Sequence, residues 1–248
     1  DDLQRLYGVR AEAIVCDAHP DYASTRYAHR TGLPRRQVFH HHAHAAAVAG
    51  EYPDIARWLV FTWDGTGYGE DGTLWGGEAL LGAPGAWRRV ASFRPFHLPG
   101  GDKAAREPWR SALALCWEAD VEWPAHEDTA LLHAAWSKRL NAPQSSAVGR
   151  LFDAAAALTG INTISSFEGQ GPMLLEAACQ GEAQPVALPL ARHHNGIWQT
   201  DWSPLLTRLL DDQCTAGARA TLFHASLAHA LLEQARQIRA EHGDFCVG

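Results

Sequence analysis

Two histidines spaced four residues apart carry the most specific chemical signal in the sequence. His40 and His44 belong to residues 39–44 (FHHHAH), which follow a predicted strand and open a predicted helix. Residues four apart share one helical face, so both imidazoles can bind a single ion, whereas His41 and His42 point elsewhere. A polar or packed helix start is the alternative interpretation. The spacing favours a two-histidine metal site.

A metal site built from nitrogen and oxygen needs at least a third ligand, which is usually a carboxylate when the metal is left open to substrate. Asp64 stands at the end of the next predicted strand, where a parallel neighbour would bring it beside the start of the helix. An ordinary turn aspartate is the alternative. We predict that His40, His44 and Asp64 bind a divalent metal, iron or zinc.

Residues 64–72 (DGTGYGEDG) are too rich in glycine for the interior of an element, so we expect them to form the loop of a long hairpin between strands 58–63 and 73–80. Gly65, Thr66 and Gly67 would then offer successive backbone amides to a phosphate. The segment is not a Walker loop, because no Gly-Lys-Ser/Thr follows and it joins strand to strand. Glycine-rich hairpins often bind no ligand. This segment is of interest because it adjoins the predicted metal ligand Asp64.

Two predicted helix starts offer further contacts to a nucleotide. Gly169 and Gly171 permit close approach of a ligand just before a helix, although a plain helix-start turn would look the same. Arg150 and Asp153, three residues apart, form either a surface pair or contacts to ribose and phosphate.

A group of three basic residues offers contacts to an anion. Lys103, Arg106 and Arg110 lie beside Trp109 and are candidate anion contacts, with a solvated helix start as the alternative.

The elements that must position these residues point to an α/β fold. Short apolar runs alternate with helical patterns through the first 65 residues, as in βαβ units with a partly parallel sheet. Beyond residue 103 the pattern becomes mostly helical, ending in a long amphipathic stretch over 218–241. We therefore predict a first α/β lobe at 1–100, which carries the metal and glycine-rich motifs, and a mainly helical second lobe at 101–248.

Composition narrows the function classes. The 248 residues contain 21 Lys and Arg against 28 Asp and Glu, and this net charge of −7 argues against a binder of nucleic acid or of membrane surfaces. Five separated cysteines without CxxC spacing argue against a disulfide framework and favour a reducing compartment. No apolar run is long enough to span a membrane, and no signal segment opens the chain. We expect a soluble, cytoplasmic protein.

Six strings occur together in the order typical of one family. They cover about residues 12–170 and are 16–25 (CDAHPDYAST), 40–44 (HHHAH), 64–78 (DGTGYGEDGTLWGGE), 98–102 (LPGGD) with 107–110 (EPWR), 146–153 (SAVGRLFD) and 167–170 (FEGQ). On these strings the chain resembles the C-terminal catalytic domain of the hydrogenase maturation carbamoyltransferases, the HypF family. Six ordered motifs are far more specific than any single one.

The resemblance implies a two-lobed, actin-like ATPase (RNase H-like) fold and a carbamoyl transfer. In such enzymes ATP and carbamoyl phosphate give carbamoyl-adenylate in a separate YrdC-like domain, and this domain passes the carbamoyl group to the C-terminal cysteine of HypE during synthesis of the cyanide ligand of [NiFe]-hydrogenase. The family pattern assigns the metal to His40, His44 and Asp64. It places five residues around the adenylate: Thr66, Gly67, Asp153, Glu168 and Gly171.

Two other functions stay open. A small-molecule O-carbamoyltransferase would share the metal and adenylate motifs, and a non-catalytic metal-binding or docking module would bind HypE without transferring anything. The chain starts without Met and stops at a predicted strand, so we expect a piece truncated at both ends that shows no carbamoyl-phosphate-dependent ATP turnover alone.

Overall fold

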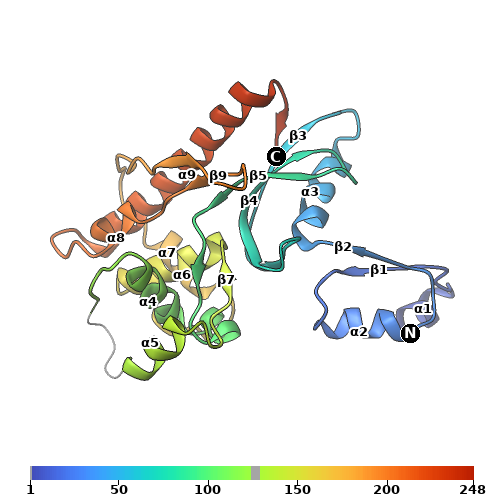
Figure 1. The fold of residues 1–248 in the computed structure, drawn as a ribbon, viewed down its shortest axis with the longest axis horizontal. Coiled ribbons are helices and arrows are strands. Elements are labelled where there is room, and N and C mark those ends of the chain that lie inside the picture. The colour runs from blue at the N-terminus through green and yellow to red at the C-terminus, as the bar shows by residue number, and fades with distance from the viewer. Residues whose placement is uncertain (1, 124–128) are drawn as a thin grey trace.

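The computed structural model describes residues 2–123 and 129–248, which form a mixed α/β structure (Figure 1). This confirms the predicted α/β class. The helices are α1 Asp2–Tyr7, α2 Ala23–Arg30, α3 His40–Glu51, α4 Pro108–Glu118, α5 Ala130–Ser137, α6 Val148–Leu158, α7 Gln170–Ala177, α8 Pro204–Leu209 and α9 Ala216–His242, with a 3-10 helix η1 Gly101–Ala105. The strands are β1 Ile14–Asp17, β2 Arg35–Val38, β3 Trp58–Tyr68, β4 Leu74–Gly82, β5 Arg88–Phe93, β6 Phe96–His97, β7 Gln144–Ser145, β8 Leu190–Arg192, β9 Trp198–Thr200 and β10 Cys246–Val247.

The N-terminal elements form a small unit to one side of the main sheet, drawn in blue in Figure 1. Strands β1 and β2 pair in parallel, from Ile14 opposite Arg35 to Asp17 opposite Val38. Parallel strands end at the same edge of a sheet, so Asp17 comes to lie next to the first residue of α3, which follows β2 directly. This register brings two segments of the predicted site together.

Among the described residues, the main sheet has eight strands, with the path β10-β3-β4-β5-β9-β8 and with β7 joining β4 to β6. Strands β3 and β4 form an antiparallel hairpin whose register shifts between Trp63 and Gly67. The prediction that 64–72 is entirely a loop was wrong, because β3 continues through a bulge as far as Tyr68. Glycine tolerates the irregular backbone and close packing of a bulge, so a glycine-rich string does not by itself end a strand.

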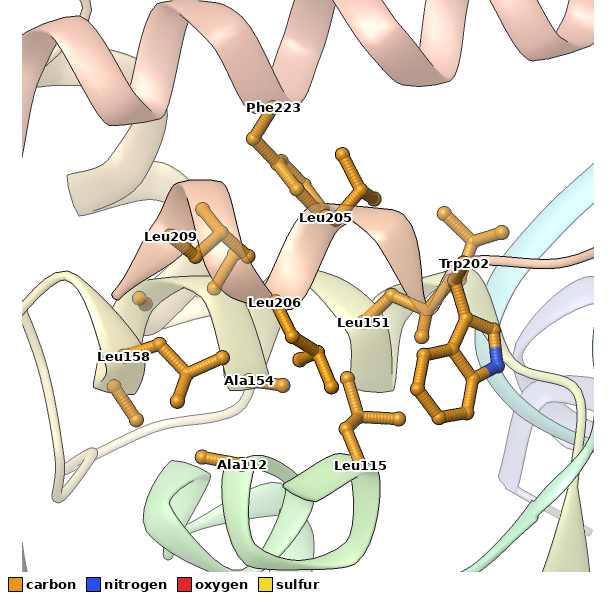
Figure 2. Close-up of a cluster of buried hydrophobic side chains, with 14 of the residues drawn as sticks. Ala112, Leu115, Leu151, Ala154, Leu158, Trp202, Leu205, Leu206, Leu209 and Phe223 are labelled. Atoms are coloured by element: carbon orange, nitrogen blue, oxygen red, sulfur yellow. The ribbon is translucent and has the colours of Figure 1, made fainter. Parts of the chain in front are cut away.

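The largest core lies between the helices that cover the sheet (Figure 2). Leu151 of α6 and Leu115 of α4 meet Leu206 of α8, and Trp202 and Phe223 close the cluster. Alanines at 154–157 of α6 are almost fully buried and let the neighbouring helix approach closely. The core therefore fixes α6, whose first turn packs against β3.

The sheet contains strands from both sides of residue 100. The division into lobes at 1–100 and 101–248 stays a prediction. None of the helices in the described parts of the chain has the length and apolarity that a bilayer crossing requires.

Candidate functional site

Two elements, α3 and β3, position the three predicted metal ligands. Helix α3 begins at His40, so His40 and His44 lie one turn apart on the same helical face. Asp64 lies inside β3, at the position where the register with β4 shifts. Its carboxylate Oδ1 accepts a hydrogen bond from the backbone N–H of Gly65 at 2.6 Å, which leaves Oδ2 directed to the histidines.

The three side chains converge on a common point. His40 Nε2 lies 2.9 Å from Asp64 Oδ2 and 3.2 Å from His44 Nε2, and His44 Nε2 lies 3.6 Å from Asp64 Oδ2. Bonds of about 2.1 Å to a metal would place neighbouring ligand atoms about 3.0 Å apart in an octahedron and about 3.4 Å apart in a tetrahedron. The measured separations lie within about 0.2 Å of that range, so the donor set fits a divalent cation.

Asp17 is a further acidic side chain at this cluster, and sequence reasoning did not single it out. Its Oδ2 lies 3.0 Å from His40 Nδ1, on the opposite side of the ring from Asp64. The signal that could have found it is its position at the end of a predicted strand parallel to the one that precedes His40.

The other two histidines of the run do not join the cluster at bonding distance. His41 is fully buried, its Nε2 lies 4.0 Å from Asp64 Oδ2, and burial lowers the pKa of its imidazole to about 4. His41 is therefore neutral at pH 7. His42 faces Glu70 at 3.8 Å. Gly67 packs directly against His40 and His41, since a Cβ there would lie 2.7 Å from His40 Cδ2 and 2.5 Å from His41 Cε1.

The start of α6 lies against the same stretch of β3. A Cβ on Gly149 would lie 2.7 Å from Gly65 Cα and 3.0 Å from the carbonyl oxygen of Asp64, so only glycine fits. The guanidinium of Arg150 and the carboxylate of Glu168 lie over Gly65, with Arg150 Nη2 3.8 Å from Glu168 Oε1. Metal candidates and predicted nucleotide contacts are thus neighbours.

Two cavities open at this contact, and both are lined by Gly65, Arg150 and Glu168. The first, of about 310 Å³, adds Thr66, Asp102 and Arg106. The second, of about 360 Å³, is more apolar. It adds Trp63, Asp64, Phe152, Gly169 and Pro172.

Asp153 lies behind Arg150 rather than in the lining of either cavity. Its side chain is 1% exposed, its Oδ2 lies 2.9 Å from Arg150 Nη1, and burial raises the pKa of its carboxyl to about 6 in spite of that pairing. Gly171 packs against it, because a Cβ on Gly171 would lie 3.2 Å from Asp153 Oδ1. The structure therefore brings Arg150, Asp153, Glu168 and Gly171 together.

The three candidate anion contacts separate in the structure. Arg106 lines the first cavity together with Arg150. Arg110 instead pairs with Glu107 at 2.5 Å, and its guanidinium lies over the ring of Trp109. Lys103 is exposed and is absent from the lining of both cavities.

Comparison with known proteins defines the class first. Residues 60–247 match the family model described as "Carbamoyltransferase, Kae1-like Domain, second subdomain", and residues 1–51 match the "HypF Kae1-like domain". The matches therefore assign this α/β chain, with its histidines and aspartates beside a glycine-rich strand, to the Kae1-like domains. The chain belongs to the HypF family, as its six motifs predicted.

Curated relatives support the same family. Carbamoyltransferase HypF of Rhodobacter capsulatus is 41% identical over 256 residues, which is 96% of this chain and 33% of the relative. Carbamoyltransferase HypF of Rhizobium leguminosarum bv. viciae is 38% identical over 248 residues, which is 97% of this chain and 32% of the relative. The chain thus spans about a third of the length of these relatives.

Solved structures agree with the fold. A full-length HypF in the phosphate- and nucleotide-bound form superimposes with a TM-score of 0.87 at 27% identity, over 97% of this chain and 33% of that one. The HypF of T. kodakarensis, at 24% identity, has the same fold with a TM-score of 0.83, over 97% of this chain and 35% of that one.

Proposed function

We propose that this chain is the part of a HypF-type enzyme that moves a carbamoyl group from carbamoyl-adenylate to the thiol of the C-terminal cysteine of HypE. The observation that carries the proposal is that Asp64 and Gly65 are adjacent in β3. Asp64 belongs to the cluster with His40 and His44, and the next residue lines both cavities. A ligand bound in either cavity would therefore contact Gly65, the residue next to the candidate metal ligand Asp64.

The proposed transfer forms a carbon–sulfur bond and breaks the bond between the carbamoyl carbon and the phosphate oxygen. The partner's thiolate attacks the carbamoyl carbon, its proton having gone to solvent, and AMP leaves with the electron pair of the broken bond. No nucleophile from this chain is needed.

The residues of the two cavities suit the parts of an adenylate. Arg106 and Arg150 supply positive charge to the phosphate of the departing AMP, and the start of α6 lies close by. Trp63, Phe152 and Pro172 give the second cavity apolar walls that suit a purine ring.

His40, His44 and Asp64 would hold the divalent metal, iron or zinc, and when bound it would act as a Lewis acid toward a carbamoyl or phosphate oxygen. ATP and carbamoyl phosphate would supply the adenylate in the whole enzyme. A cytoplasmic location and the absence of nucleic-acid and membrane partners stay predictions.

Mass spectrometry of the acceptor tests the function. The whole HypF-type enzyme is incubated with a divalent metal, ATP, carbamoyl phosphate and HypE, and the expected product is HypE carrying one carbamoyl group on its terminal cysteine. Asp64→Ala should abolish the transfer, while Asp54→Ala, at an exposed position outside the site, should retain it. Carbamoylation of a hydroxyl compound in place of the thiol would refute the proposed acceptor, and equal transfer by both variants would refute the site.

A further inference from the structure

The Asp17 carboxylate is hydrogen-bonded to the turn that follows β1, and it also contacts Nδ1 of the candidate metal ligand His40. Its Oδ1 accepts a hydrogen bond from the backbone N–H of His19 at 2.7 Å, and its backbone carbonyl accepts one from Thr25 Oγ1 at 3.0 Å. Oδ2 lies 3.0 Å from His40 Nδ1. The Asp17 side chain is only 16% exposed, so its carboxylate has little freedom to turn away.

Two carboxylates flank the His40 ring, Asp17 at Nδ1 and Asp64 at Nε2. A neutral imidazole carries its proton on one nitrogen and a lone pair on the other. A cation in the cluster would take the lone pair of Nε2, so the proton would lie on Nδ1, where the Asp17 carboxylate accepts it. The lone pair then lies on Nε2, the atom that faces His44 and Asp64.

We propose that Asp17 is a positioning residue of the metal site, which holds His40 in the Nδ1–H tautomer and fixes the plane of its ring. The inference rests on the proposed metal site. A carboxylate behind a ligating histidine orients the ring and makes its free nitrogen a stronger donor, and loss of such a partner typically weakens metal binding 10- to 100-fold.

The position of Asp17 in the fold explains why it can serve this role. It ends β1 opposite Val38, two residues before His40, so the parallel pairing of β1 and β2 sets the separation of carboxylate and ring. Ala18 N–H donates to the carbonyl of Val38 at 3.0 Å and continues that pairing past Asp17. The backbone hydrogen bonds of Ala18 and His19 thus fix the position of the Asp17 carboxylate beside His40.

The test compares Asp17→Ala with Asp21→Ala, a matched change at an exposed aspartate of the same segment. Zinc affinity is measured by competition with a chromophoric chelator, and urea unfolding of the metal-free proteins reports their folding. We expect Asp17→Ala to bind zinc 10- to 100-fold more weakly than Asp21→Ala. Asp17→Asn keeps an oxygen that accepts from Nδ1–H, and it should recover part of the affinity.

Nitrogen NMR of the zinc-bound protein reads the tautomer directly. His40 should carry its proton on Nδ1 in the wild type and in Asp17→Asn, and this signal should be lost or exchange-broadened in Asp17→Ala. Equal zinc affinity of Asp17→Ala and Asp21→Ala would overturn the inference, as would weaker binding explained fully by unfolding. If the wild type itself binds no zinc, iron or manganese, the proposed metal site is refuted. Failure of the metal site is thereby distinguished from failure of the role of Asp17.

Discussion

Replacing Gly67 by alanine should weaken metal binding and also lower the stability of the fold. The new Cβ would lie 2.5 Å from His41 Cε1, 2.7 Å from His40 Cδ2 and 2.9 Å from His40 Cβ. Carbon atoms in contact are normally at least about 3.5 Å apart, so the rings must move by about 1 Å. Metal–ligand distances tolerate errors of about 0.2 Å, so a displacement of this size breaks the arrangement of His40.

The magnitude follows from the price of overpacking, about 1–3 kcal/mol. In the metal-free protein the His40 ring can move away, whereas His41 is fully buried and still meets the new methyl group, so part of the strain lowers the free energy of unfolding. Metal binding must draw the His40 ring back against the methyl group, so the strain on His40 appears as lost affinity. A loss of 1–3 kcal/mol in binding free energy corresponds to a dissociation constant about 5- to 150-fold larger.

The assay is a zinc titration of Gly67→Ala beside Gly50→Ala. Gly50 lies in the last turn of the same helix as His40, and a Cβ there meets nothing within 4 Å. The control should bind zinc as the wild type does and unfold at slightly higher urea, because alanine favours a helix over glycine. Wild-type zinc affinity in a folded Gly67→Ala protein would refute the assignment of His40 as a ligand.

Two further predictions concern the α6 side of the site. Gly149→Ala should lower the free energy of unfolding by about 1–3 kcal/mol, because its Cβ would push against the backbone of Gly65 at 2.7 Å; an unchanged urea midpoint would contradict this packing. Burial raises the pKa of Asp153 from 3.8 to about 6, so the folded state binds the extra proton between these values and loses stability as pH rises from about 4 to about 7. Relative to Asp153→Asn, the wild type should lose about 3 kcal/mol over that interval in urea unfolding, and parallel pH profiles would disprove the raised pKa.

The sequence could predict the part of the site that depends on local spacing. His40 and His44 are one helical turn apart, and that relation holds wherever the helix lies. Arg150 and Asp153 follow the same logic on α6, and their ion pair is observed. Asp64 could be added because a carboxylate was needed at the end of a neighbouring strand, although the strand continues beyond it.

Contacts between distant segments were beyond the reach of local patterns. Asp17 is 23 residues from His40, and the two meet only through the parallel register of β1 and β2. The separation of Lys103, Arg106 and Arg110 likewise depends on the 3-10 helix η1 and the start of α4, which set each side chain in a different direction. Charge and spacing alone do not specify such directions.

A crystal of the protein soaked with zinc and AMP, with diffraction collected on both sides of the zinc absorption edge, tests the central claim most directly. We predict one anomalous peak bonded to His40 Nε2, His44 Nε2 and Asp64 Oδ2, with the AMP phosphate beside Arg150. A zinc ion bound elsewhere, or AMP bound away from the two cavities that share Gly65, would contradict the account.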